Sequence, residues 1–166
     1  MTRSATNEEE EEEALTPEDV YNKLAAAVAS DDSDASEVLA SLVDSISSTD
    51  PLQLGYAPEG ADPAIVLAVK SGKVDAVVAL LSGGMKIRPT SDGVPLLHYA
   101  VQSETPSSEI VDVLLDFGVD VDQQDSMGRT ALQCALLSRN VGLVELLLGR
   151  NADISLKDYE GKGLAE

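Results

Sequence analysis

The chain has 166 residues, of which 30 are Asp or Glu and 11 are Lys or Arg, so its formal net charge is −19. An acidic surface of this kind repels phosphate and argues against direct binding of nucleic acid. The single Cys134 excludes an intrachain disulfide and any zinc site built from several cysteines. Apolar residues make up 43% of the chain and aromatic residues only 3%, which favours packed helices over a β-sandwich.

The sequence also indicates where the protein resides. No apolar run approaches the roughly 20 residues that a membrane span needs. Glutamates occupy the N-terminal region, where a secretory signal would need a basic and then an apolar stretch. We therefore expect a cytoplasmic or nuclear protein that does not enter the membrane.

Acidic residues are concentrated in the first third of the chain. Residues 1–62 contain 16 acidic and 2 basic residues, including the unbroken run Glu8–Glu13. Adjacent like charges repel, so residues 1–15 are predicted to be a disordered acidic tail. Two interpretations of this tail remain open: a solubilising segment without specific contacts, or an electrostatic lure for a basic client such as a ribosomal protein or a histone tail.

Two helices are expected after the tail. The first begins at Thr16, a suitable N-cap, followed by Pro17 at the first helical position. Its apolar residues recur at helical spacing: Val20, Leu24 and Ala27 or Val28. The second begins at Asp34, and its apolar stripe consists of Val38, Leu39, Leu42, Val43 and Ile46. A connection over 47–62 follows, which Leu52, Leu54 and Tyr56 are expected to pack against the helices.

The remainder of the chain repeats itself. Asp125–Gly128 recurs 33 residues later as Asp158–Gly161, and the stretch 91–101 aligns with 126–136. Each unit combines a short helix, a longer helix and a Gly/Asp-rich turn. The longer helices close on residues that favour the left-handed conformation, namely Gly84, Gly118 and Asn151. Neither helix can bury its apolar face alone, so stacked units are expected to share one core.

With these repeats the chain resembles the ankyrin-repeat family over about residues 63–161. The resemblance rests on Asp92-Gly93, Leu97-His98-Tyr99-Ala100 and Gly118-Val119-Asp120, and in the next unit on Gly128-Arg129-Thr130-Ala131-Leu132, Leu146-Leu147-Leu148 and Asn151-Ala152-Asp153. It implies an all-α solenoid of stacked helix-turn-helix units joined by β-hairpin-like turns. The expected domain spans 16–166, with a divergent first repeat at 16–50, repeats at about 60–89, 90–124 and 125–157, and a partial repeat at 158–166.

The sequence departs from the family pattern at the start of two short helices. In the family, a Thr that opens the first helix hydrogen-bonds a His three residues later. Here Pro95 stands before His98, whereas Thr130 is followed by Gln133. The Thr–His pair is incomplete in both units, so we expect a modest loss of stability and no change of fold.

No residue pattern indicates catalysis, a cofactor or a metal. The resemblance implies that His98 bonds the backbone of the next hairpin, and Cys134 is expected in the core. Asp120, Asp122 and Asp125 alternate as in a calcium loop but lack its central glycine and closing glutamate, so they are interpreted as a turn. Phosphate loops and nucleophile elbows are also absent from the sequence, and an enzyme is not expected.

The resemblance implies a protein partner, bound on a concave surface formed by hairpin tips and first helices. Transferred to this chain, the tip residues are Ser91, Asp92, Val94, Ser126, Met127, Arg129, Tyr159, Glu160 and Lys162. The first-helix residues are Lys70, Ser71, Gln102, Ser103, Leu137 and Ser138. Met127, Arg129, Leu137 and Tyr159 combine residue types enriched at interface hot spots, and we predict that they form the centre of the site.

A non-enzymatic adaptor or inhibitor is the predicted function. The alternatives are an acidic chaperone or escort for a basic client, for which the charge of the first third argues, and a regulatory fragment of a longer multidomain protein. At the other end, residues 158–166 begin a further unit, and the apolar helix at 143–151 has no evident cap after it. A partner surface, or self-association through this end, is expected there.

Overall fold

The computed structural model of the chain describes residues 16–30, 35–49, 54–87, 90, 92–103 and 106–163. Within these ranges the chain forms eight helices and no strand longer than a single bridge. The helices are α1 (Pro17–Ala29), α2 (Ala35–Thr49), α3 (Ala64–Lys70), α4 (Val74–Ser82), α5 (Leu96–Gln102), α6 (Ser108–Asp116), α7 (Ala131–Leu137) and α8 (Val141–Gly149). The predicted tail at 1–15, Asp34, Leu52 and Ser91 lie outside the described residues.

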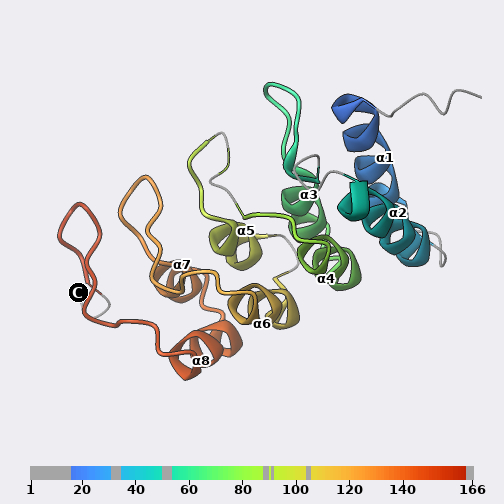
Figure 1. Cartoon of the computed structure of the whole chain (residues 1–166). Coiled ribbons are helices and arrows are strands. Elements are labelled where there is room, and N and C mark those ends of the chain that lie inside the picture. The colour runs from blue at the N-terminus through green and yellow to red at the C-terminus, as the bar shows by residue number, and fades with distance from the viewer. Residues whose placement is uncertain are drawn as a thin grey trace, which may run out of the picture.

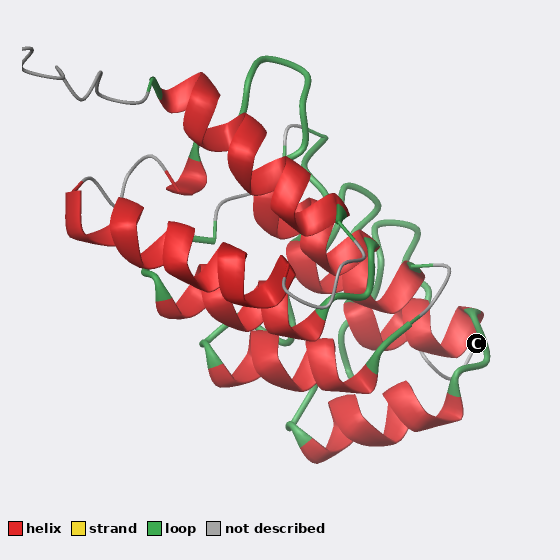
Figure 2. Ribbon diagram, turned by 90° about the vertical axis from the view of Figure 1, so that its right-hand side faces the viewer, coloured by secondary structure: helices red, strands yellow, loops and turns green. Residues whose placement is uncertain are grey.

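The helices stack as four pairs in a single row. The first helices α1, α3, α5 and α7 pack against one another in order, and so do the second helices α2, α4, α6 and α8. The loops that join successive pairs project to one side of the stack (Figure 1). In the view turned by 90°, the helices of successive pairs run roughly parallel, and each pair is displaced from the one before it (Figure 2). The all-α solenoid expected from the repeats is therefore confirmed.

The first helix begins as the sequence predicts. The Thr16 hydroxyl accepts a hydrogen bond from the Asp19 backbone N–H, and the Asp19 carboxylate accepts from the Thr16 backbone N–H. This reciprocal cap satisfies two of the amide groups that a helix start leaves unpaired. Downstream, Val20, Leu24 and Val28 are buried along one face, where they join the core shared with the next pair.

The second helix agrees with its predicted stripe except at one position. Leu39, Val43 and Ile46 are buried, whereas Val38 is exposed. Val38 directly precedes Leu39 and lies about 100° around the helix from it, at the edge of the apolar stripe, and its side chain is exposed there. The helix also runs to Thr49 and so enters the predicted connection. Within that connection Leu54 is buried as expected, but Tyr56 is exposed.

The longer helices of the repeats end as predicted. Gly84, Gly118 and Asn151 have φ angles of 88°, 83° and 63°. After each of them the chain turns back, and the next backbone N–H bonds a carbonyl of the last helical turn, as Ala152 does to Leu147 at 3.1 Å. The left-handed residue thus satisfies carbonyls that the helix end would leave unpaired. No helix in the described ranges is both long and apolar enough to cross a membrane.

The hairpin-like turns repeat in geometry as well as in sequence. The Asp125 backbone N–H donates to the Arg129 carbonyl at 2.9 Å, and that of Asp158 donates to Lys162 at 3.0 Å. Both Asp side chains accept backbone N–H bonds from inside their own turns. A Cβ atom on Gly128 would lie 2.5 Å from the ring of Tyr159, so these two turns stack too closely for any other residue there.

Candidate protein-binding surface

The last residue of each short helix reaches toward the next short helix in the stack. Lys70 Nζ lies 4.6 Å from the centre of the Tyr99 ring, and Gln102 Nε2 donates to Cys134 Sγ at 3.1 Å. Leu137 is the equivalent residue of α7, and α7 is the last short helix of the row in the described residues. Its side chain is 70% exposed. Lys70 and Gln102 are thus engaged within the repeat stack, whereas Leu137 faces solvent.

The first two hairpins carry a polar network around Asp92. Its carboxylate accepts hydrogen bonds from the hydroxyls of Thr90 and Tyr99. These bonds lower the pKa of Asp92 to about 2, and the bond from Thr90 contributes more than the bond from Tyr99. Burial, followed by the hydrogen bond to Asp92, raises the pKa of Tyr99 to about 12. Lys70 is also paired with Asp62 at 2.7 Å. The charged groups of this half of the surface are already satisfied by their neighbours.

Apolar side chains gather instead at the third unit. Met127, Leu137 and Tyr159 are 59%, 70% and 73% exposed. Met127 and Tyr159 lie on adjacent turns, because the Tyr159 backbone N–H donates to the Met127 carbonyl at 3.0 Å. A shallow depression of about 220 Å³ lies between these turns and the end of α7, and its lining includes Arg129, Leu137 and Lys162. Three of the four predicted central residues thus offer exposed apolar surface, two on adjacent turns and one in the lining of the depression.

Arg129, the fourth predicted residue, is held within its own turn. Its Nε and Nη2 atoms donate to Asp125 Oδ2 at 3.0 and 2.7 Å. Burial acts to raise the pKa of Asp125, but the bonds from Arg129 and from backbone amides outweigh it, and the pKa lies below its ordinary value. Because Asp125 is buried, removing Arg129 would unbalance its charge. A substitution at Arg129 would therefore disturb the turn as well as any partner contact.

The remaining predicted site residues offer neither a large exposed apolar side chain nor an unpaired charge. Ser103 and Ser138 turn their hydroxyls onto backbone carbonyls of their own helices. Val94 is half-buried, and Ser71 is exposed. Lys162 forms an exposed ion pair of 2.6 Å with Glu160. None of these residues adds an unsatisfied charge to the surface, so the apolar residues dominate its chemistry.

Beneath this surface His98, Asp125 and Cys134 form a buried cluster. One potential ligand atom from each lies within 4.8 Å of the others. His98 Nε2 donates to the Arg129 carbonyl at 2.8 Å, and both Asp125 oxygens accept several hydrogen bonds. Burial lowers the pKa of His98 and raises that of the Cys134 thiol. The cluster joins a hairpin to two helices, as expected for His98, and Cys134 is in the core as predicted.

Gln133 has a role that sequence reasoning missed. Its Oε1 accepts from the Thr130 backbone N–H, and its Nε2 donates to the Leu156 and Lys162 carbonyls at 3.2 and 3.3 Å. One amide side chain therefore caps α7 and also anchors the next hairpin. His98 anchors its hairpin in the same way, but its Nδ1 has no hydrogen-bond partner in the described chain. The equivalent donor would be the N–H of residue 95, which proline lacks.

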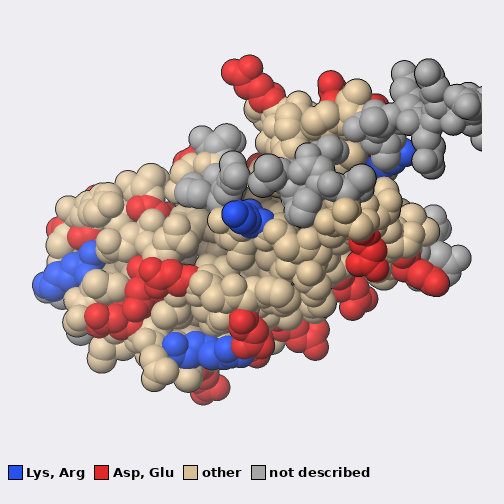
Figure 3. Space-filling view, viewed as in Figure 1, with Lys and Arg blue, Asp and Glu red and all other residues tan. Residues whose placement is uncertain are grey.

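The second helices form an acidic side of the stack. The four helices contain seven acidic residues and no Lys or Arg: Glu37, Asp44, Asp75, Glu109, Asp112, Asp116 and Glu145. Figure 3 shows acidic side chains along this row. Arg150, which follows α8, pairs with Asp112 and Asp116 at 2.7 and 2.5 Å. This acidic side is separate from the apolar residues of the hairpins.

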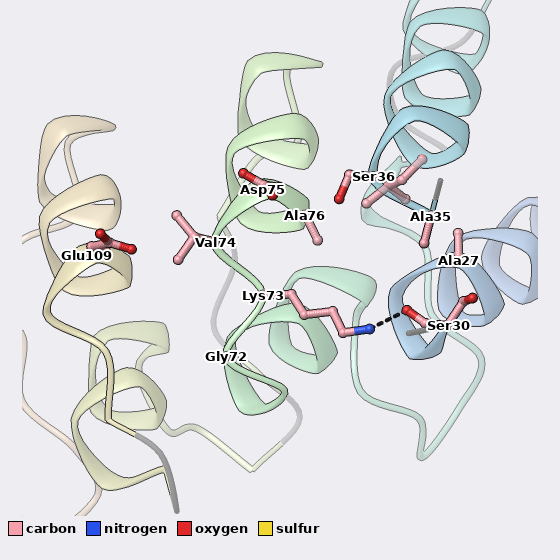
Figure 4. A pocket seen from close by; sticks show the side chains of 11 residues that line it. Ala27, Ser30, Ala35, Ser36, Gly72, Lys73, Val74, Asp75, Ala76 and Glu109 are labelled. Atoms are coloured by element: carbon pink, nitrogen blue, oxygen red, sulfur yellow. Dashed lines mark hydrogen bonds between the residues drawn. The ribbon is translucent and has the colours of Figure 1, made fainter. Parts of the chain in front are cut away.

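A groove of about 480 Å³ lies where α2, α4 and α6 begin (Figure 4). The Lys73 side chain extends across it and donates to the Ser30 carbonyl, and the carboxylates of Asp75 and Glu109 lie along the same groove. The lining residues lie near the end of α1 and at the starts of α2, α4 and α6, and none of them belongs to the predicted binding surface.

Stacked helix pairs with projecting hairpins define the chain as a repeat protein of the solenoid class. The family comparison is more specific. The family described as ankyrin repeats, in three copies, matches residues 24–125 and again residues 65–158. The chain belongs to this family, whose repeats generally mediate protein–protein interactions. The first match begins inside α1, and thus includes most of the pair that departs from the repeat signature.

Several curated proteins are similar to parts of this chain. An ADP-ribosylation factor GTPase-activating protein, AGD2 of Arabidopsis thaliana, is 38% identical over 74 residues, which are 45% of this chain and 9% of that protein. The nuclear factor NF-kappa-B p105 subunit of Gallus gallus is 33% identical over 107 residues, 63% of this chain and 10% of that protein. A putative ankyrin repeat protein of Rickettsia bellii is 29% identical over 101 residues, 59% of this chain and 55% of its own length.

Proposed function

We propose that this chain is a non-enzymatic adaptor or inhibitor that binds a protein partner through the surface of its third unit. The observation that carries the proposal is the exposure of Met127, Leu137 and Tyr159. Met127 and Tyr159 lie on adjacent turns, and Leu137 lines the depression next to these turns. Large apolar and aromatic side chains that lie together are the usual anchors of protein interfaces. The satisfied polar network around Asp92 has no comparable anchor, so the partner's main contact is with the third unit.

Variants of the exposed apolar residues test this proposal. The full chain, immobilised, retains its partner from a cell extract, and the Leu137→Asp and Tyr159→Ala variants lose it. Val38→Asp is the matched control, because Val38 is an exposed apolar residue on α2. With the purified partner, Tyr159→Ala weakens binding by about 1–3 kcal/mol. Equal retention by all three variants would place the partner elsewhere on the chain.

A second candidate function is the escort of a basic client. It is favoured by the seven acidic residues of the second helices, which contain no Lys or Arg. Binding by such a surface depends on charge and is weakened by salt. Repeating the capture at two ionic strengths separates the two functions, because apolar contacts at the third unit persist in high salt and those of an acidic escort do not.

The proposal also states that the chain is not itself an enzyme and that it is a regulatory region of a longer protein. Some relatives are named as enzymes, including a human diacylglycerol kinase iota and an L-asparaginase of Dirofilaria immitis, but this chain matches only 10% and 15% of their lengths. A regulatory ankyrin region of a longer multidomain protein is consistent with these proportions. Assays of the purified chain for activities of this kind, with no turnover expected, test the non-enzymatic part.

A further inference from the structure

An apolar groove lies between the turns that follow α4 and α6. Its volume is about 490 Å³, and its apolar lining consists of Leu81, Met85, Ile87, Phe117 and Val119. Leu81 and Met85 are buried, whereas Phe117 is 46% exposed. We call these five residues the Phe117 groove. The two turns lead on to α5 and α7, so the groove lies within the row of helix pairs, and it shares no residue with the surface of the third unit.

Phe117 occupies a position that the other units fill differently. The residues directly before the left-handed ends of the longer helices are equivalent: Gly83, Phe117 and Arg150. Arg150 reaches back to α6 and pairs with two of its carboxylates, and Gly83 has no side chain. Phe117 is the only phenylalanine of the chain, and it stands beside the end of α4 with nearly half of its surface exposed. The repeat therefore does not require an aromatic ring at this position.

The groove adjoins the acidic side of the stack. Asp116 directly precedes Phe117, and Asp120 lines the groove. Of the seven acidic residues on the second helices, two are paired with Arg150, and the other five form no ion pair among the described residues. The carboxyl ends of α4 and α6 add partial negative charge beside the groove. This surface attracts cations and repels anions.

The chain contains an example of a cation bound on this side. The Arg150 guanidinium bridges Asp112 and Asp116, at 2.7 and 2.5 Å, across one turn of α6. Lys86 fixes the opposite limit, because it is exposed on the wall that follows α4 and forms no ion pair among the described residues. A basic side chain is thus repelled at the Lys86 wall and attracted at the Asp120 wall. The groove suits an apolar side chain with its basic neighbours on the α6 side.

We propose that the Phe117 groove binds a basic segment of a partner protein, in which one large apolar side chain is flanked by Lys or Arg. This binding mode rests on the second candidate function, the escort of a basic client, and adds an apolar anchor to it. The apolar side chain packs against Phe117 and loses its contact with water. The flanking cations lie against the acidic second helices. Charge alone would admit any cationic chain, whereas the groove distinguishes among them by shape.

Fluorescence anisotropy of two labelled synthetic peptides with the full chain tests the proposal. Both peptides consist of lysine and serine, and they differ only at one central position, which is leucine or alanine. The wild type binds the leucine peptide on the order of tenfold more tightly, as expected for the burial of most of one leucine side chain. Phe117→Ala removes this difference and leaves the affinity for the alanine peptide unchanged, which also shows that the variant is folded.

Two further variants locate the contact. Val78→Ala is the matched control, because Val78 is an exposed apolar residue of α4 outside the groove, and it retains the preference for leucine. Lys86→Glu tightens the binding of both peptides, since it replaces a repulsive charge with an attractive one. Added salt weakens both peptides but preserves their ratio, because salt screens the charges and not the apolar contact.

The possible failures separate this inference from the function on which it rests. Equal binding of the two peptides by the wild type, or an unchanged preference in Phe117→Ala, would exclude the groove and leave the escort of basic clients standing. If neither peptide bound at low salt, both the groove and the escort function would be rejected. Tighter binding of a peptide with glutamate in place of lysine would assign the groove to an acidic partner and overturn the proposal.

Discussion

His98 Nε2 lies 2.8 Å from the carbonyl oxygen of Arg129, a residue 31 positions later in the chain. Since a carbonyl oxygen only accepts hydrogen bonds, Nε2 must carry a proton. Burial lowers the pKa of His98, which favours the neutral ring with Nδ1 unprotonated. The bond ties α5 to the hairpin of the next unit. Gln133 forms the corresponding bonds one unit later, so neighbouring repeats are joined by the same device with different side chains.

The histidine makes stability depend on pH. Burial lowers the pKa of His98, so its contribution is complete above the ordinary value near 6.5 and is lost as the pH falls below it. The slope from this one group is at most about 1.4 kcal/mol per pH unit. We expect urea unfolding to show this dependence between pH 5 and 7 in the wild type. His98→Gln should abolish it while retaining the donor, and an unchanged slope in that variant would contradict the assignment.

Pro95 has no backbone N–H to donate to Nδ1 of His98, which has no hydrogen-bond partner in the described chain. Pro95→Thr supplies an N–H and a hydroxyl in the arrangement that Thr130 and Gln133 already show. We expect it to raise the free energy of unfolding by about 1–2 kcal/mol, the value of a helix cap together with a satisfied buried acceptor. Chemical denaturation measures the change. Pro95→Ala restores only the N–H, so its free energy of unfolding should rise by less. An equal rise in both variants would show that the threonine hydroxyl does not contribute.

The 33-residue period predicted stacked helix pairs, and the family resemblance predicted the hairpin-like turns between them. Each helix ending also carries its own local signal. Gly84, Gly118 and Asn151 adopt the left-handed conformation that their residue types favour. The prediction that Val38 belongs to the buried stripe was wrong, because Val38 lies at the edge of that stripe on the helix and is exposed. At the candidate site, Leu137 is exposed, and its part in binding a partner stays a prediction. The pairing of Arg129 with Asp125 could not be predicted, since it depends on the exact path of the turn between them.

A close approach of α2 and α4 explains one glycine. A Cβ atom at Gly83 would lie 2.1 Å from Val43 Cγ1 and 2.9 Å from Ser47 Oγ, and the Ser47 hydroxyl donates to the Gly83 carbonyl at 2.7 Å. We expect Gly83→Ala to lower the free energy of unfolding by about 1–3 kcal/mol, because Val43 is buried and cannot move freely. Thermal or urea unfolding measures the loss.

Gly149 is the matched control for that substitution. It ends α8, and a Cβ atom there meets nothing within 4 Å. Gly149→Ala should therefore be neutral or stabilise the fold by up to about 1 kcal/mol through helix propensity. Similar losses in both variants would show that the proximity of Val43 to Gly83 is not the cause.

The network around Asp92 predicts a titration that can be followed directly. The Thr90 hydroxyl is the main cause of the low pKa of Asp92, about 2, and Tyr99 is the second. In Thr90→Val we expect the pKa of Asp92 to rise toward its ordinary value of 3.8, and in Tyr99→Phe to rise by less. Because the folded pKa is depressed, the stabilisation by Asp92 is present above about pH 4 and is lost as the pH falls toward 2.

Carbon NMR of the Asp92 carboxyl group measures these pKa values in the folded chain. Thr90→Ser is the control, because it keeps the hydroxyl and should leave the pKa of Asp92 low. The side chain is largely exposed, so solvent screens the interaction and the effect on global stability should be small even where the pKa changes clearly. An Asp92 pKa that stays near 2 in Thr90→Val would show that backbone amides or Tyr99, and not the threonine hydroxyl, stabilise the carboxylate.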